Sequence, residues 1–203
     1  MIIKDQKGQG FMEVIVAIGI MIIGIVSILI LTSYNLTAAD YGEKRLIASN
    51  LAREAIEVIR NVRDSNWVAG NDWDTGLPVD PATDDYRQIV KFTDTINGSS
   101  YVLEGVEEAI DTCEVCKLYV TNTLFSHTDT GTYSSFKRQV EFRDICDTDI
   151  GNPSNALKFL DIDESCVGIG TRVGYELKSI VQWQASNGDA KRVELIDRIF
   201  DWR

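Results

Sequence analysis

Two cysteines have the spacing of a thiol-disulfide exchange motif, which makes them the clearest candidates for covalent chemistry. Cys113 and Cys116 enclose two residues in CEVC, and the strand-like stretch CKLYVTN follows directly. Redox enzymes place such a pair at the start of a helix in a βαβ unit, which this order does not fit. We therefore expect a structural disulfide here in preference to redox catalysis.

Two further cysteines, Cys146 and Cys166, stand 20 positions apart and do not form a second close pair. A zinc site built from all four cysteines is therefore disfavoured. An even number of cysteines, all after the apolar N-terminal run, is compatible with two disulfides in an oxidising compartment. The sequence alone does not determine their connectivity.

Other side chains offer little chemistry. His127 is the only histidine, in the turn-like FSHTDTG, so neither a catalytic triad nor a multi-histidine metal site is available, and we expect a solvated loop residue. Two acidic loops, Asp72–Asp85 and the stretch DTDIGNPSN from Asp147, carry carboxylates that suit calcium. Neither has EF-hand spacing, so we expect solvated loops and no cofactor.

A single carboxylate marks the longest apolar run. The segment KGQGFMEVIVAIGIMIIGIVSILIL, Lys7–Leu31, contains Glu13 just before 18 uncharged residues, Val14–Leu31. That run is ~27 Å long as a helix, close to the ~30 Å hydrocarbon core of a bilayer. An unpaired charge in such a segment costs roughly 2.5–3.5 kcal/mol, so Glu13 needs a partner.

The flanking charges predict the orientation of this segment. Lys4 and Lys7 outweigh Asp5 on the N-terminal side, which places the N-terminus in the cytoplasm and the chain after Ala39 outside. A cleaved signal peptide is disfavoured because the apolar run is too long, although LTAAD resembles a cleavage site. A plain signal anchor explains the length of the run but leaves Glu13 unexplained. A core helix of a soluble protein is also disfavoured, because such helices are shorter and less uniformly apolar than this run.

The string KGQGFMEVIVAIGI resembles the N-terminal segment of the type IV pilin and type II secretion pseudopilin superfamily. The resemblance implies a leader, residues 1–8, that prepilin peptidase removes after Gly8. Gln9 then becomes the first mature residue, where the family usually has Phe or Met. In the family, this first residue is N-methylated. Glu13 becomes the fifth residue; cleavage after Gly10 would make it the third.

The same resemblance implies how the segment is used. Residues 9–39 form the transmembrane and filament-core helix, in which Phe11 and Glu13 serve assembly and Glu13 pairs with the new amino group of a neighbouring subunit. The implied partners are prepilin peptidase, other pilin or pseudopilin subunits, an inner-membrane assembly platform and, before assembly, lipid. The implied locations are the cytoplasmic (inner) membrane, by a single pass, and then a filament at the cell surface.

An amphipathic helical pattern follows in residues 40–66. Its apolar positions recur at spacings of three and four residues, on one helix face, at Ile47, Leu51, Ala55, Val58 and Val62. The sequence therefore predicts one nearly continuous helix from about Met12 to about Asp64, whose second half lies on a globular domain.

The remaining residues, 67–203, predict an antiparallel head. Trp67–Asp85 is rich in Gly, Pro and Asp and indicates a loop. Asn187-Gly188 predicts a hairpin between the last two strands. Strand-like stretches begin at Arg87, Ser99, Cys116, Ser135, Gly174 and Lys191. In FKRQVEF, Arg138 interrupts the otherwise apolar face of Phe136, Val140 and Phe142. We expect an α+β fold, a pilin-like lollipop whose long helix packs on four to six strands.

The chain is acidic, which bears on its partners and its function. With 20 Lys+Arg against 31 Asp+Glu the net charge is −11, which disfavours nucleic acid as a partner. We expect a non-enzymatic filament subunit; the absence of proline before Pro78 and the cysteine-bearing head favour a minor or tip-associated one. The alternatives are a signal-anchored extracytoplasmic binding domain that does not polymerise and, more remotely, a tethered thiol oxidoreductase. The sequence does not distinguish pilus, secretion and DNA-uptake systems.

Overall fold

A computed structural model describes residues 9–78, 86–95, 98–121, 124–129, 131–148, 157–162, 164–185 and 188–201. The chain forms two compact units, Met1–Glu43 and Lys44–Arg203. The predicted leader, and much of both acidic loops, lie outside the described residues.

A single helix, α1 (Gln9–Ala69), contributes to both units. It continues through Gly19, Gly24 and Gly42, the weakest helix formers within it. It also begins earlier and ends later than the predicted Met12–Asp64, so placing Trp67 in a loop was wrong.

The end of α1 is defined by a glycine cap. Gly70 adopts φ 76°, its N–H donates to the Trp67 carbonyl at 3.1 Å, and the Asn71 N–H donates to the Asn66 carbonyl at 2.9 Å. This is the Schellman arrangement, which satisfies the last carbonyls of a helix and favours glycine at the left-handed position. The Asn66 amide also donates to the Trp73 and Thr75 carbonyls, fixing the following turns.

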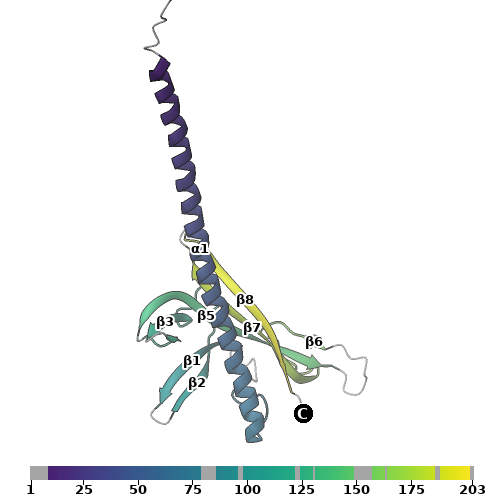
Figure 1. Ribbon diagram of the computed structural model, residues 1–203. Coiled ribbons are helices and arrows are strands. Elements are labelled where there is room, and N and C mark those ends of the chain that lie inside the picture. The colour runs from purple at the N-terminus through teal and green to yellow at the C-terminus, as the bar shows by residue number, and fades with distance from the viewer. Residues whose placement is uncertain are drawn as a thin grey trace, which may run out of the picture. The chain divides into compact units, whose positions relative to one another are not determined.

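The second unit contains an antiparallel sheet of eight strands among the described residues (Figure 1). Its longest strand, β5, pairs with β1, β3, β6 and β7, while β2 pairs with β1, β4 with β3 and β8 with β7. The strands are β1 (Arg87–Thr95), β2 (Gly98–Gly105), β3 (Lys117–Thr121), β4 (Leu124–Ser126), β5 (Thr132–Asp147), β6 (Lys158–Phe159), β7 (Thr171–Gln184) and β8 (Ala190–Phe200).

The α+β architecture and the antiparallel sheet predicted from sequence are confirmed. The six predicted strands are all present, but the expected total of four to six was too low because β4 and β6 were missed. These two strands have only three and two residues, and they form through pairing with β3 and β5 rather than through a local pattern of their own.

The hairpin of β7 and β8 follows the predicted turn signal. Its register runs without interruption from Gly174 opposite Phe200 to Gln184 opposite Ala190. At the turn, Gly188 adopts φ 86°, and the Ala185 N–H donates to the Asp189 carbonyl at 2.8 Å. Asn187 itself lies outside the described residues.

The core lies between the second half of α1 and the sheet (Figure 1). On the predicted apolar stripe, Leu51, Ala55 and Val58 are buried, while Ile47 and Val62 are partly buried. The stripe contacts two apolar clusters in succession. The first contains Ala48, Leu51, Ala52, Leu118, Phe136, Val181 and Trp183, and the second contains Ala55, Val58, Ile59, Trp73, Leu77, Tyr86, Val90, Val140, Phe142, Tyr175, Leu177 and Ile199.

A charged side chain lies in β5 between residues of these two clusters. Arg138 is 1% exposed, and its guanidinium donates to the carbonyls of Leu51 at 3.4 Å and Val90 at 3.1 Å. Its Nη1 atom also lies 3.3 Å from a carboxylate oxygen of Glu54 on α1. The polar interruption seen in FKRQVEF therefore marks an ion pair that joins the helix to the sheet.

Candidate functional site

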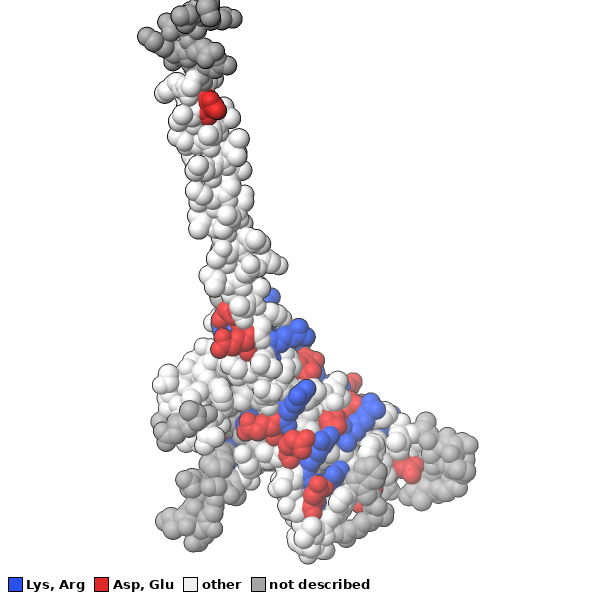
Figure 2. All heavy atoms as spheres, in the orientation of Figure 1, with Lys and Arg blue, Asp and Glu red and all other residues white. Residues whose placement is uncertain are grey.

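The first unit presents an apolar surface on all sides. Every described side chain from Gly10 to Ala39 is exposed, and its large apolar residues range from 47% exposure at Val26 to 72% at Tyr34. Figure 2 shows this part of the helix as uncharged surface apart from acidic atoms near its start. The segment has the length and composition to cross a bilayer.

The predicted assembly residues lie at the beginning of this surface. Phe11 is 71% exposed and Glu13 is also exposed. Because α1 starts at Gln9, Glu13 lies about one helical turn from the residue that would carry a new amino group after processing. Gly8 lies outside the described residues, as does the side chain of Gln9.

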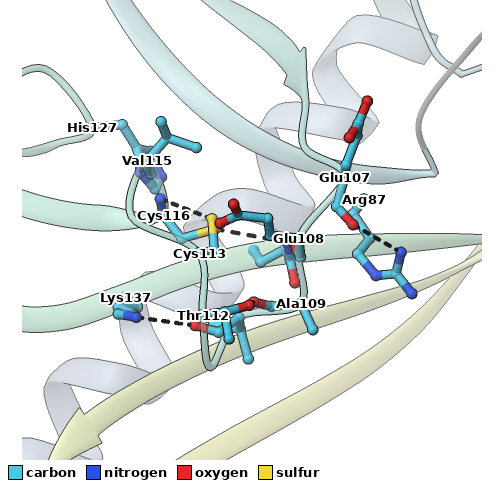
Figure 3. Close-up of a disulfide and its surroundings, with 12 residues drawn as sticks. Arg87, Glu107, Glu108, Ala109, Thr112, Cys113, Val115, Cys116, His127 and Lys137 are labelled. Carbon is cyan, nitrogen blue, oxygen red and sulfur yellow. Dashed lines mark hydrogen bonds between the residues drawn. A yellow bond between two sulfur atoms is a disulfide. The ribbon is translucent and has the colours of Figure 1, made fainter.

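The first cysteine pair forms a buried disulfide between Cys113 and Cys116 (Figure 3), and both residues are 0% exposed. It packs with Ile89 and Val106, and the Gln139 amide donates to the Glu108 carbonyl at 2.7 Å. The disulfide therefore holds the connection between β2 and β3 against the sheet. Both sulfur atoms of this pair are therefore shielded from attack by an external thiol in the folded chain.

The second disulfide joins Cys146, in β5, to Cys166. It lies in a separate apolar cluster with Leu160, so the structure does not bring the four cysteines together. The Cys166 N–H donates to Asp144 at 3.2 Å, and Arg172 donates to the same carboxylate at 2.9 Å. The disulfide and this ion pair together fix the chain that follows β6.

Asp144 accepts hydrogen bonds from the Cys166 N–H, Arg172 and Tyr86, and it is 0% exposed. Burial raises its pKa, against the lowering effects of Arg172 and of the Cys166 N–H. Burial likewise raises the pKa of the neighbouring Tyr86, which keeps its phenol protonated. Arg172 also lies 5.1 Å from the centre of the Tyr175 ring, so the cluster is braced by aromatic packing and contributes to structure.

The expectation that His127 is a solvated loop residue was wrong. His127 is 7% exposed, and its Nδ1 donates to the Val115 carbonyl at 3.2 Å beside the Cys113–Cys116 disulfide (Figure 3). Desolvation by burial, with a smaller effect of Arg138, lowers its pKa to about 3. The histidine therefore remains neutral in the folded protein at any moderate pH.

This burial predicts a pH dependence of stability. His127 has a folded pKa of about 3 and an ordinary unfolded value of about 6.5, so between these values the unfolded chain binds more protons and stability falls as pH is lowered. Between pH ~6.5 and ~4.5 the loss from this residue is roughly 2–3 kcal/mol. Urea unfolding of wild type and His127→Gln at both pH values should show the smaller loss in the variant; equal losses would contradict the prediction.

Sequence reasoning also missed the partner of Arg138. The alternation in FKRQVEF placed this arginine on an apolar face, but nothing local indicated Glu54, which lies far upstream on α1. Within the part of the chain that the structure describes, no cluster of three or more His, Cys, Asp or Glu side chains could hold a metal ion.

Comparison of the chain with protein families, curated proteins and solved structures finds no match.

Proposed function

We propose that this protein is a minor subunit of a type IV pilus or type II secretion pseudopilus, processed by prepilin peptidase and assembled through its N-terminal helix. The observation that carries the proposal is the exposed apolar surface of residues 10–39 with Glu13 as its single charged side chain. Water is an unfavourable surrounding for so large an apolar surface, and lipid is an unfavourable one for the carboxylate. A bundle of similar helices from neighbouring subunits can bury the apolar surface and also provide a partner for the carboxylate.

The position of the carboxylate supports the same proposal. Removal of residues 1–8 leaves a positive amino group at the first residue of α1, about one turn from Glu13. In an apolar surrounding these opposite charges attract strongly, and pairing between neighbouring subunits neutralises both. Such a pair also sets the axial register between helices.

The second candidate is a tethered extracytoplasmic domain that does not polymerise. It is favoured by the same apolar surface, since lipid is a suitable surrounding for the uncharged run Val14–Leu31 without any further subunit. The two candidates differ in the fate of residues 1–8, because only the filament subunit requires their removal.

The experiment that tests the proposal is the N-terminal sequence and intact mass of the protein from membranes of its host. We expect wild type to start at Gln9 and Gly8→Ala to retain Met1. The matched control is Gly10→Ala, where an added Cβ meets no atom within 4 Å; it should be processed like wild type. Uncleaved wild type would favour the tethered domain, and a start near Asp40 would indicate an ordinary secreted protein.

A further inference from the structure

A cavity of about 210 Å³ opens on the sheet where β5, β7 and β8 meet the loop that carries the Cys113–Cys116 disulfide. Lys137 and Gln182, opposite each other in register, line it together with Tyr133 and Ser135 from β5 and Asp111 from the loop. Lys137 follows Phe136, which faces α1, so alternation along β5 turns Lys137 to the other face of the sheet. The cavity is smaller than the pockets that hold drug-sized ligands, whose volumes begin at ~300 Å³.

A bulge in β5 lies beside this cavity. Lys117 pairs with Lys137, but Tyr119, two residues later, pairs with Tyr133, so β5 has two more residues than β3 over the same span. Ser135 lies within the bulge at φ 68°, the one non-glycine residue with positive φ among those described. Bulges that turn a side chain, and strained backbone at non-glycine residues, are concentrated at functional sites.

The lining combines donors, acceptors and an aromatic ring. The Lys137 ammonium is positioned by the carbonyls of Ile110 at 3.3 Å and Asp111 at 2.9 Å, and Figure 3 shows it directed at this loop. The Gln182 Oε1 atom is buried without a hydrogen-bond partner among the described residues. Tyr133 is 45% exposed.

The Tyr133 ring has a fixed place beside this cavity. The Tyr119 ring lies 6.0 Å from it, centre to centre, and the Lys117 ammonium lies 5.7 Å from its centre. Burial raises the pKa of its phenol, which therefore stays protonated and able to donate a hydrogen bond.

We propose that this cavity binds one ring of a polyhydroxylated ligand, a monosaccharide unit. The lining contains one basic residue, Lys137, and one acidic residue, Asp111, which disfavours a multiply charged anion such as phosphate. Hydroxyl groups act as donors and acceptors at once, which matches a lining that offers both. The open side leaves room for a sugar chain to continue outward.

This inference does not depend on the proposed filament role, because a tethered domain could bind the same ligand. The test uses the full chain in phosphatidylcholine nanodiscs, since glycoside detergents would compete for the site. Saturation-transfer NMR is recorded with glucose, galactose, mannose and N-acetylglucosamine, and with glutamate and inorganic phosphate as probes of other classes. We expect binding of at least one sugar with a millimolar Kd.

Variants then locate the site. Tyr133→Ala and the surface variant Asp111→Ala should each weaken sugar binding by about tenfold or more. The matched control is Tyr101→Ala, since Tyr101 on β2 is 46% exposed and does not line the cavity. Absence of transfer to every sugar, unchanged binding in both cavity variants, or binding of glutamate or phosphate alone would each overturn the proposal.

Discussion

Replacing Glu13 with valine is expected to remove the protein from surface filaments while leaving it in the membrane. Residues 10–39 of α1 already have the composition of a membrane span, and the change removes the only charged side chain among them. Insertion therefore improves, by at most the roughly 2.5–3.5 kcal/mol that an unpaired charge costs at the centre of a membrane-spanning helix. In the proposed filament the variant lacks the partner of the new amino group, and we expect at least a tenfold drop, or ~1.4 kcal/mol, in the amount found in sheared filaments.

Two further variants make this result specific to charge and position. Glu13→Gln keeps the size of the side chain but not its charge, and should fail in assembly like Glu13→Val. Glu43→Gln removes an exposed carboxylate outside the apolar segment and should assemble normally. Immunoblots of membrane and sheared fractions measure each outcome, and normal incorporation of Glu13→Val would refute the pairing.

Replacing Arg138 with alanine is expected to destabilise the second unit by about 3–5 kcal/mol. The change leaves a cavity between α1 and the sheet and removes the donors to the Leu51 and Val90 carbonyls. Glu54 contributes less to the loss, because its side chain is 38% exposed and can be hydrated. Urea unfolding followed by tryptophan fluorescence reports on this core, in which Trp73 and Trp183 are buried.

The double variant Arg138→Met/Glu54→Gln separates packing from charge. Methionine fills much of the arginine volume without a buried charge, so we expect stability within ~1–2 kcal/mol of wild type. As a surface control, Arg192, whose side chain is 57% exposed, pairs with Glu194 in β8, and Arg192→Ala should change stability by less than ~0.5 kcal/mol. A loss in Arg138→Ala no larger than in this control would show that the ion pair is not a structural link.

The features predicted well from sequence are those with a periodic or local signal. The apolar stripe containing Leu51, Ala55 and Val58 has helical spacing, and it is the face that the sheet covers. The β7–β8 hairpin carries its own turn signal. The true end of α1 also had a local signal, since Gly70 is a typical C-cap, but the Gly, Asp and Pro content of the next residues obscured it.

The features that were missed depend on contacts between distant segments. His127 lies in a turn-like sequence, and its burial depends on the approach of Val115 in another segment. The Arg138–Glu54 pair requires the register of α1 on the sheet, which no spacing within either element gives. The bulge at Ser135 depends on a mismatch in register between β3 and β5, and alternation within one strand does not reveal such a mismatch.

The order of contacts between α1 and β5 has a mechanical consequence. In the first apolar cluster, Leu51 of the helix lies with Phe136 of the strand. In the second cluster, the later helix residues Ala55 and Ile59 lie with the later strand residues Val140 and Phe142. Helix and strand therefore run in the same general direction. A tensile load entering the second unit through the helix at Lys44 therefore acts in shear. All of these contacts resist it together, instead of peeling apart one after another, and the buried ion pair between the two clusters shares the load.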